Sequence, residues 1–194
     1  YTGFLGSGEQ IDIITHIFRE FSFTKKIVDP VMGDHGTIYD SYTPEMCHAM
    51  KELVAHSTLT TPNLTELCIL TDTPYRSDFS QEEIAAMCKK LSETGVSQIV
   101  VTGIEQDNLI GNALYENGDF DILYGEKVLP LRPGTGDVFA SILAGYSLHN
   151  IPLRDAIQQA SAFIRNCLIT SAQYHIPIND GVCFEEHLGM LIPE

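Results

Sequence analysis

The chain has 194 residues, of which 44% are hydrophobic and 19% are charged. That length suffices for one domain with a substantial core, and the composition is that of a folded globular protein rather than a disordered chain. Asp and Glu total 26 against 11 Lys and Arg, a formal charge of −15, and such a surface repels nucleic-acid phosphates. We expect no nucleic-acid partner, and a nucleotide site would need a metal ion or backbone amides.

The cysteines and the hydropathy indicate a cytoplasmic protein. Five cysteines are present, an odd number, and no Cys-x-x-Cys pair occurs. This favours free thiols in a reducing compartment over disulfides or a metal site. No apolar run approaches the ~20 residues that cross a bilayer, so we expect no membrane partner.

Helices and short apolar strands alternate along the first hundred residues. Helical spacing of apolar residues, Thr43-Pro44 as a helix start, and capping-box patterns at Asn63 and Ser80 indicate the helices. Short apolar runs that end in polar residues indicate buried strands. The predicted helices cover 8–21, 43–55, a segment from Asn63, and 80–94; the predicted strands cover 27–29, 57–60 and 98–103.

The pattern changes in the second half of the chain. Residues 109–124 alternate around Asn117-Gly118, a dipeptide that strongly indicates a β-hairpin. Two helices are predicted at about 136–149 and 153–173, with a short one near 184–190. Because no repeat or low-complexity linker interrupts the chain, we predict one domain.

This alternation predicts an α/β fold: a mostly parallel central sheet flanked by helices on both faces, with an antiparallel hairpin near 109–124. Ligands of such sheets bind beyond the carboxyl ends of the strands. The polar residues predicted at those ends are Asp29, Thr61 and Thr102.

The segment Gly134-Thr135-Gly136-Asp137 carries the first candidate chemistry. Two glycines at a helix start let amide groups point at one spot, and the positive helix end favours an anion such as a phosphoryl group. Asp137 could take the proton from an attacking hydroxyl. The segment is neither a Walker A loop nor a dinucleotide Gly-x-Gly-x-x-Gly motif. Taken alone, it fits better a carboxylate that caps a helix after a glycine turn.

Two further acidic loops follow predicted strands. Asp29 and Asp34 lie five residues apart around a turn, and they could hold Mg2+ through water; ordinary turn chemistry explains them equally well. In the segment 61–66, Glu66 could steer metal-bound water while Asn63 shapes the turn, although a simple capping box explains this spacing better. Together the three loops offer a metal site, an anion hole and a base, which are the parts that phosphoryl transfer requires.

In their order along the chain and in their residues, these motifs resemble those of the ribokinase-like superfamily, and within it those of the pyridoxal kinase branch. The matching segments are TGFLGS (2–7), DPVMGD (29–34), TPNLTE (61–66), VVTG (100–103) and GTGDVFASILAGY (134–146). The resemblance spans nearly the whole chain. It implies one ribokinase-like domain over 1–194, which lacks the family's N-terminal segment.

The resemblance also implies roles for individual residues. Asp137 is then the base for the 5′-hydroxyl of pyridoxal, and Gly134, Thr135 and Gly136 form the anion hole. Asp29 and Glu66 belong to the Mg2+ and phosphate network, with Asp34 as a nearby ligand. The nucleotide side comprises Thr61, Asn63, Thr102 and Tyr39, and Phe4 faces the pyridine ring.

The implied reaction uses Mg2+ and ATP, with a monovalent cation as a further expected ion and a homodimer as the expected assembly. The hydroxymethylpyrimidine kinases of thiamine synthesis are the nearest alternative, but that branch typically has Cys where this chain has Asp137. A sugar or nucleoside kinase of the same superfamily, or a ligand-binding module without turnover, also stays open.

Overall fold

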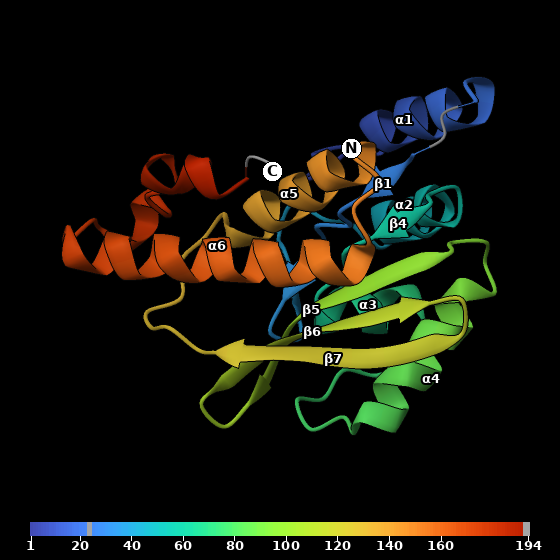
Figure 1. The fold of residues 1–194 in the computed structure, drawn as a ribbon. Helices are drawn as coiled ribbons and strands as arrows, with labels where there is room; N and C mark the ends of the chain where they lie inside the picture. Colours follow the sequence, from blue (N-terminus) through green and yellow to red (C-terminus); the bar gives the residue numbers. More distant parts are fainter. Residues whose placement is uncertain (23–24, 192–194) are drawn as a thin grey trace. The chain divides into compact units, whose positions relative to one another are not determined.

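Five strands form the main sheet of this computed structural model, which describes residues 1–22 and 25–191. Their order is β1-β4-β5-β6-β7 (Figure 1). The strands β1 (Ile27–Val28), β4 (Leu59–Thr60) and β5 (Gln98–Gln106) pair in parallel. The strands β6 (Leu109–Glu116) and β7 (Asp119–Glu126) follow through two-residue connections, a length that joins antiparallel strands only. The predicted α/β class with its hairpin is therefore confirmed.

The hairpin forms where the sequence predicted it. Asn117 and Gly118 have φ values of 55° and 90°, the left-handed conformation that a tight two-residue turn requires and that Asn and Gly tolerate best. Local turn chemistry thus sets the register of β6 and β7.

The predicted end of β5 at Gly103 is wrong, because the strand continues to Gln106. The amide of Thr102 donates to Pro62 O at 2.9 Å, and Thr102 forms a parallel bridge with Asn63. Beyond Thr102 the strand continues as one arm of the ribbon with β6. Thr102 therefore marks the last parallel contact rather than the end of the strand.

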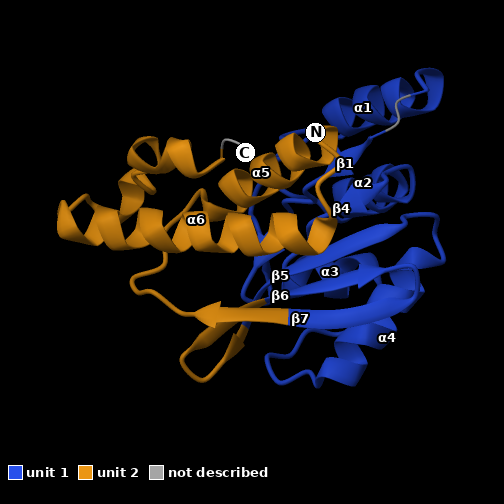
Figure 2. Ribbon diagram, viewed as in Figure 1, with its two compact units in different colours: residues 1–104, 112–122 blue, residues 105–111, 123–194 orange. Residues whose placement is uncertain are grey.

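Two compact units divide the chain (Figure 2). Unit 1 comprises Tyr1–Ile104 and Asn112–Ile122, and unit 2 comprises Glu105–Gly111 and Leu123–Glu194. The prediction of a single domain over 1–194 stays a prediction.

Unit 1 contains four helices among its described residues, namely α1 (Gly8–Glu20), α2 (Pro44–Ala55), α3 (Leu64–Leu70) and α4 (Gln81–Ser92). The predicted caps are confirmed: the Thr43 hydroxyl accepts from Met46 N, and complete capping boxes open α3 at Asn63 and α4 at Ser80. These caps satisfy amides that the first helical turn leaves without partners.

The core of unit 1 surrounds β5. Ile99, Val100 and Val101 are all fully buried; since neighbouring strand residues point to opposite faces, both faces of this strand are covered. The small hairpin of β2 (Gly33–Asp34) and β3 (Thr37–Ile38) was not predicted, because two-residue strands carry no readable periodicity.

Unit 2 contains α5 (Thr135–Leu148), α6 (Leu153–Gln173) and two 3-10 helices, η1 (Ile178–Asp180) and η2 (Glu185–Leu191). α5 packs against α6, with Leu143 and Phe163 buried. All five cysteines are free thiols, four of them buried. Within the described residues, no helix combines the length and apolar character of a membrane span.

Candidate active site

Asp29 and Thr61 lie together at the carboxyl ends of two neighbouring parallel strands. The Thr61 hydroxyl donates to Asp29 Oδ1 at 3.0 Å, and both residues are buried. The amide of Asp29 donates to Thr2 O at 2.9 Å. Asp29 and Thr61 thus directly follow β1 and β4, at the strand ends where the sequence predicted them.

Glu66 joins two of the predicted loops. Its Oε2 accepts from Asn63 N at 2.8 Å, which completes the capping box of α3. Its Oε1 accepts from Met32 N at 3.1 Å, inside the segment 29–34. The same carboxylate thus caps a helix and holds the neighbouring acidic loop, so the capping interpretation and a place in the site are both compatible with its contacts.

The electrostatics around Glu66 are unusual for a carboxylate. It is only 3% exposed. Burial raises the pKa of Glu66 to about 8, and the nearby Asp29 carboxylate acts in the same direction, whereas hydrogen bonds from Asn63, Met32 and Gly33 act against it. Two carboxylates this close and this buried favour a proton or a cation between them.

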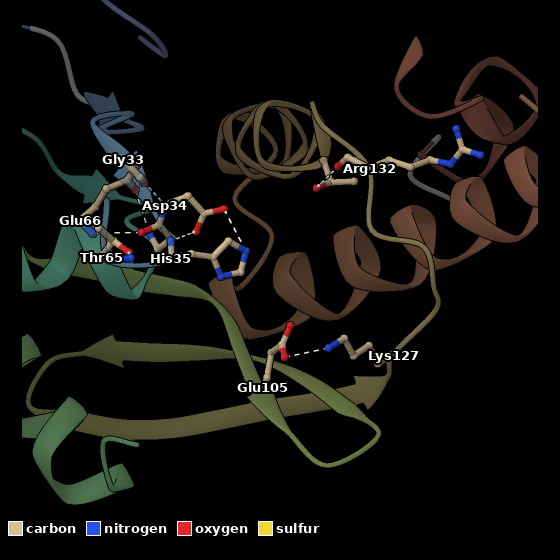
Figure 3. Close-up of polar contacts among 11 residues, drawn as sticks. Gly33, Asp34, His35, Thr65, Glu66, Glu105, Lys127 and Arg132 are labelled. Atoms are coloured by element: carbon tan, nitrogen blue, oxygen red, sulfur yellow. Dashed lines mark hydrogen bonds and ion pairs between the residues drawn. The ribbon is translucent and has the colours of Figure 1, made fainter. Parts of the chain in front are cut away.

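The β2–β3 hairpin packs against α3 and is joined to the start of this helix by two hydrogen bonds. Asn63 Nδ2 donates to Gly33 O and Gly36 N donates to Thr65 Oγ1, both at 2.8 Å (Figure 3). A Cβ at Gly33 would lie 2.3 Å from Thr37 O, so only glycine allows the two hairpin arms to meet.

Asp34 lies on this hairpin and is exposed to solvent. Its Oδ1 accepts from His35 N at 2.8 Å, and its Oδ2 lies 3.6 Å from His35 Nε2 (Figure 3). In contrast to Asp29 and Glu66, it is half-exposed, so it is available to a ligand from outside the loop.

The donor set of this region fits a hard divalent cation. Carboxylate and hydroxyl oxygens dominate it, and Mg2+ prefers such ligands while it keeps several waters. Over the ranges 1–22 and 25–191, no group of three or more His, Cys, Asp or Glu residues is placed to hold a metal unaided. A Mg2+ bound through Asp29 and Glu66 would therefore use water and phosphate oxygens as further ligands.

Two predicted aromatic residues are accessible in unit 1. Tyr39 is 41% exposed and its amide donates to Met32 O at 3.0 Å. Phe4 is 53% exposed, and its ring centroid lies 6.2 Å from that of Tyr42. Sequence reasoning missed Tyr42, whose buried hydroxyl has no hydrogen-bond partner among the described residues. No sequence signal distinguishes it from a core aromatic.

The glycine loop belongs to unit 2. Gly134 is the N-cap of α5 with φ 83°, and no side chain caps the helix. Asp137 is the third helical residue and is exposed. Asp137 therefore does not cap the helix, and the uncapped amides of the first turn retain the positive end that attracts anions.

Arg132 lies in the same loop, and the sequence analysis did not identify it as a candidate site residue. Its guanidinium is buried and donates to carbonyl groups near the C-terminus of the described chain. Only the tertiary structure distinguishes it from a surface arginine.

Comparison with known proteins identifies the family. The model of the phosphomethylpyrimidine kinase family matches residues 1–181. A pyridoxal kinase of Arabidopsis thaliana is 31% identical over 158 residues, which cover 75% of this chain and 49% of that protein. The chain thus spans about half the length of this curated relative.

Solved structures agree with this assignment. A crystal structure from Bacteroides thetaiotaomicron, described as a phosphomethylpyrimidine kinase and obtained with pyridoxal, has a TM-score of 0.93 and 30% identity and covers 100% of this chain and 71% of its own. Pyridoxal kinase from Lactobacillus plantarum has a TM-score of 0.90 and 25% identity over 97% of this chain and 68% of its own. The chain therefore belongs to the phosphomethylpyrimidine kinase family and has the ribokinase-like α/β fold that its motifs predicted.

Proposed function

We propose that the protein is a kinase that transfers the terminal phosphoryl group of Mg-ATP to the 5′-hydroxyl of pyridoxal, pyridoxamine or pyridoxine. One observation carries this proposal: the exposed Asp137 carboxylate stands in the first turn of an uncapped helix, directly after Gly134-Thr135-Gly136. The pyridoxal bound by the Bacteroides relative supports the acceptor.

In this proposal, the residues of unit 2 carry out the transfer. Asp137 accepts the proton of the attacking hydroxyl, because an exposed carboxylate at a helix start lies within reach of a substrate. The amides of Gly134, Thr135 and Gly136 stabilise the negative charge that develops on the phosphoryl group.

The residues of unit 1 hold the nucleotide. Asp29 and Glu66, with Asp34 nearby, bind Mg2+, which neutralises phosphate charge when it is present. Phe4 offers an aromatic face to the pyridine ring. The nucleotide contacts are Thr61, Asn63, Thr102 and Tyr39. A cation is required at this site because the strongly acidic chain would otherwise repel the nucleotide phosphates.

The proposal extends to the whole protein: a single domain, a cytoplasmic location, a homodimer, and a monovalent cation as an additional ion. Hydroxymethylpyrimidine or its phosphate is the second candidate acceptor, favoured by the family model that matches residues 1–181. Asp137 favours the B6 vitamers, because the pyrimidine kinases typically have Cys at this position.

A coupled assay with Mg-ATP separates these candidates. Pyridoxal, pyridoxamine, pyridoxine and hydroxymethylpyrimidine serve as acceptors, and we expect the highest kcat/KM with a B6 vitamer. Turnover of hydroxymethylpyrimidine alone would assign the chain to the second candidate, and no turnover with any acceptor would favour a ligand-binding module.

The variant Asp137→Ala tests the base. We expect its kcat to fall by about 10²- to 10⁴-fold, the usual contribution of a general base, while nucleotide binding, measured by calorimetry, survives. Asp155→Ala is the matched control, since Asp155 is an exposed carboxylate in the first turn of α6. Unchanged turnover in Asp137→Ala would remove this residue from the mechanism.

A further inference from the structure

Arg132 is a buried cation next to the glycine loop. It directly precedes Pro133-Gly134, and only 6% of the residue is exposed. Its Nε has no partner in the described part of the chain, and no described carboxylate forms an ion pair with it. Because a buried charge is costly unless it is compensated, the surrounding groups must stabilise the guanidinium in another way.

Three backbone carbonyl groups provide this compensation. Nη1 donates to Pro177 O at 2.9 Å and to Gly181 O at 3.0 Å, and Nη2 donates to Ile176 O at 2.7 Å. We call these three oxygens the carbonyl cradle. Figure 3 shows the Arg132 side chain extending from its loop toward the C-terminal segment. Hydrogen bonds from a charged donor are about twice as strong as neutral ones.

The carbonyl cradle is anchored independently of Arg132. Ile176 N donates to Ser171 O at 3.0 Å, and Cys183 N donates to Ser171 Oγ at 2.8 Å. Ser171 is fully buried on α6, where its hydroxyl donates to Cys167 O. One residue of α6 thus holds both ends of the segment that carries the cradle. Gly181, with φ 81°, allows the tight turn between them.

The other end of Arg132 holds the start of α5. Its carbonyl oxygen accepts from the Thr135 hydroxyl at 3.3 Å, and Val138 N donates to Gly134 O at 3.1 Å. The residue that fills the cradle therefore also contacts the glycine loop directly. A displacement of Arg132 would be transmitted to the amides of Gly134, Thr135 and Gly136.

We infer that the Arg132 guanidinium is a built-in cation that fixes the glycine loop in its anion-binding conformation. Arg132 is then a positioning residue, and this role rests on the proposed kinase function. Converging carbonyl oxygens are also the ligands that monovalent metal ions prefer. The cradle therefore accepts K+ once the guanidinium is removed, whereas the natural protein needs no metal ion at this place.

The test removes the positive charge of Arg132 by substitution and offers K+ from solution in its place. Arg132→Met keeps much of the side-chain length but removes the charge. Arg132→Lys keeps the positive charge but removes the planar guanidinium, which donates from two nitrogens at once. Arg165→Met is the control, since Arg165 is a half-exposed residue of α6 paired with Glu126. For each protein, kcat and KM for pyridoxal and ATP are measured in choline chloride and in KCl, together with the thermal midpoint.

We expect kcat of Arg132→Met to fall at least about 10-fold in choline chloride, because a small displacement of an anion hole costs a large factor in rate. K+ restores most of this loss in Arg132→Met and raises its thermal midpoint. The natural chain, Arg165→Met and Arg132→Lys respond to K+ by a smaller and common factor, because a side-chain cation fills the cradle in all three. This difference in K+ response is a signature that a purely structural arginine would not produce.

Three results would overturn the inference: full kcat of Arg132→Met in choline chloride, a loss of kcat that K+ does not change, or equal K+ activation of Arg132→Met and Arg132→Lys. If the natural chain transfers phosphate to no acceptor, the proposed function fails instead. The thermal midpoint then decides alone, since K+ relative to choline should stabilise Arg132→Met more than it stabilises the natural chain, Arg165→Met and Arg132→Lys.

Discussion

The Glu66 carboxylate takes part in three separate interactions. It caps α3, it accepts from Met32 N in the neighbouring loop, and it lies close to the Asp29 carboxylate. These contacts place a charge in a buried environment, where a proton or a cation is needed to balance it. The protein without metal should therefore respond to pH at this residue.

Stability without metal should fall as the pH rises from about 5 to about 8. Burial raises the pKa of Glu66 from 4.5 to about 8, so its protonation stabilises the folded state fully below pH 4.5, and this contribution is lost as the pH approaches 8. The slope is at most about 1.4 kcal/mol per pH unit. Urea unfolding in EDTA, repeated at each pH, measures it.

Glu66→Gln is the matched variant, because it cannot titrate and should lose this slope. The described carboxylates whose pKa is lowered, such as Glu83 and Asp72, titrate below this range and cannot mimic it. A natural chain with flat stability between these pH values would contradict the raised pKa of Glu66.

Tyr42 offers a second test at the residue scale. Burial raises its pKa to about 12, and its hydroxyl has no partner among the described residues. Removing an unsatisfied buried hydroxyl is nearly neutral or stabilising. We expect Tyr42→Phe to change the free energy of unfolding by less than about 1 kcal/mol, as measured in urea. A larger loss would mean that the hydroxyl binds an ordered water.

At the scale of elements, two capping boxes differ in what they hold. The Ser80 hydroxyl accepts only from Glu83 N of α4 among the described contacts, whereas the Asn63 side chain also donates to Gly33 O and so holds the β2–β3 hairpin. The acidic loop thus depends on the same residue that starts α3.

Ser80→Ala should lower the free energy of unfolding by about 1 kcal/mol, the usual cost of a lost cap. Asn63→Ala should lower it by roughly 2 kcal/mol, because it also leaves the partly buried Gly33 carbonyl without its donor. Urea unfolding of both variants in the same buffer gives the difference. Equal losses would show that the hairpin does not depend on Asn63.

The whole molecule carries a formal charge of −15. Like charges repel in the compact state, and salt screens them over a Debye length of ~10 Å at 0.1 M. The exposed ion pairs, such as Arg165 with Glu126, contribute at most about 1 kcal/mol each. Repulsion should therefore dominate the response to salt.

The melting temperature should rise by a few degrees as choline chloride increases from about 10 to about 150 mM. Differential scanning fluorimetry measures this shift, and the choline ion avoids specific binding to metal sites. A fall in melting temperature would mean that attractive surface pairs outweigh the acidic surplus.

The sequence by itself determined the features that depend on neighbours in the chain. Helix starts at Thr43, Asn63 and Ser80, and the turn at Asn117-Gly118, follow from hydrogen bonds and φ preferences within four residues. The polar residues after buried strands, Asp29 and Thr61, follow from strand direction alone.

Only the tertiary structure decided the contacts between distant segments. Glu66 reaches Met32 across 34 positions, and Arg132 reaches Gly181 across 49; the continuation of β5 beyond Gly103 likewise depends on its partner strand. No local pattern encodes such pairs, because burial and hydrogen-bond partners arise when packing brings separate segments together. The same arginine or glutamate would be an ordinary surface charge if its partners lay elsewhere.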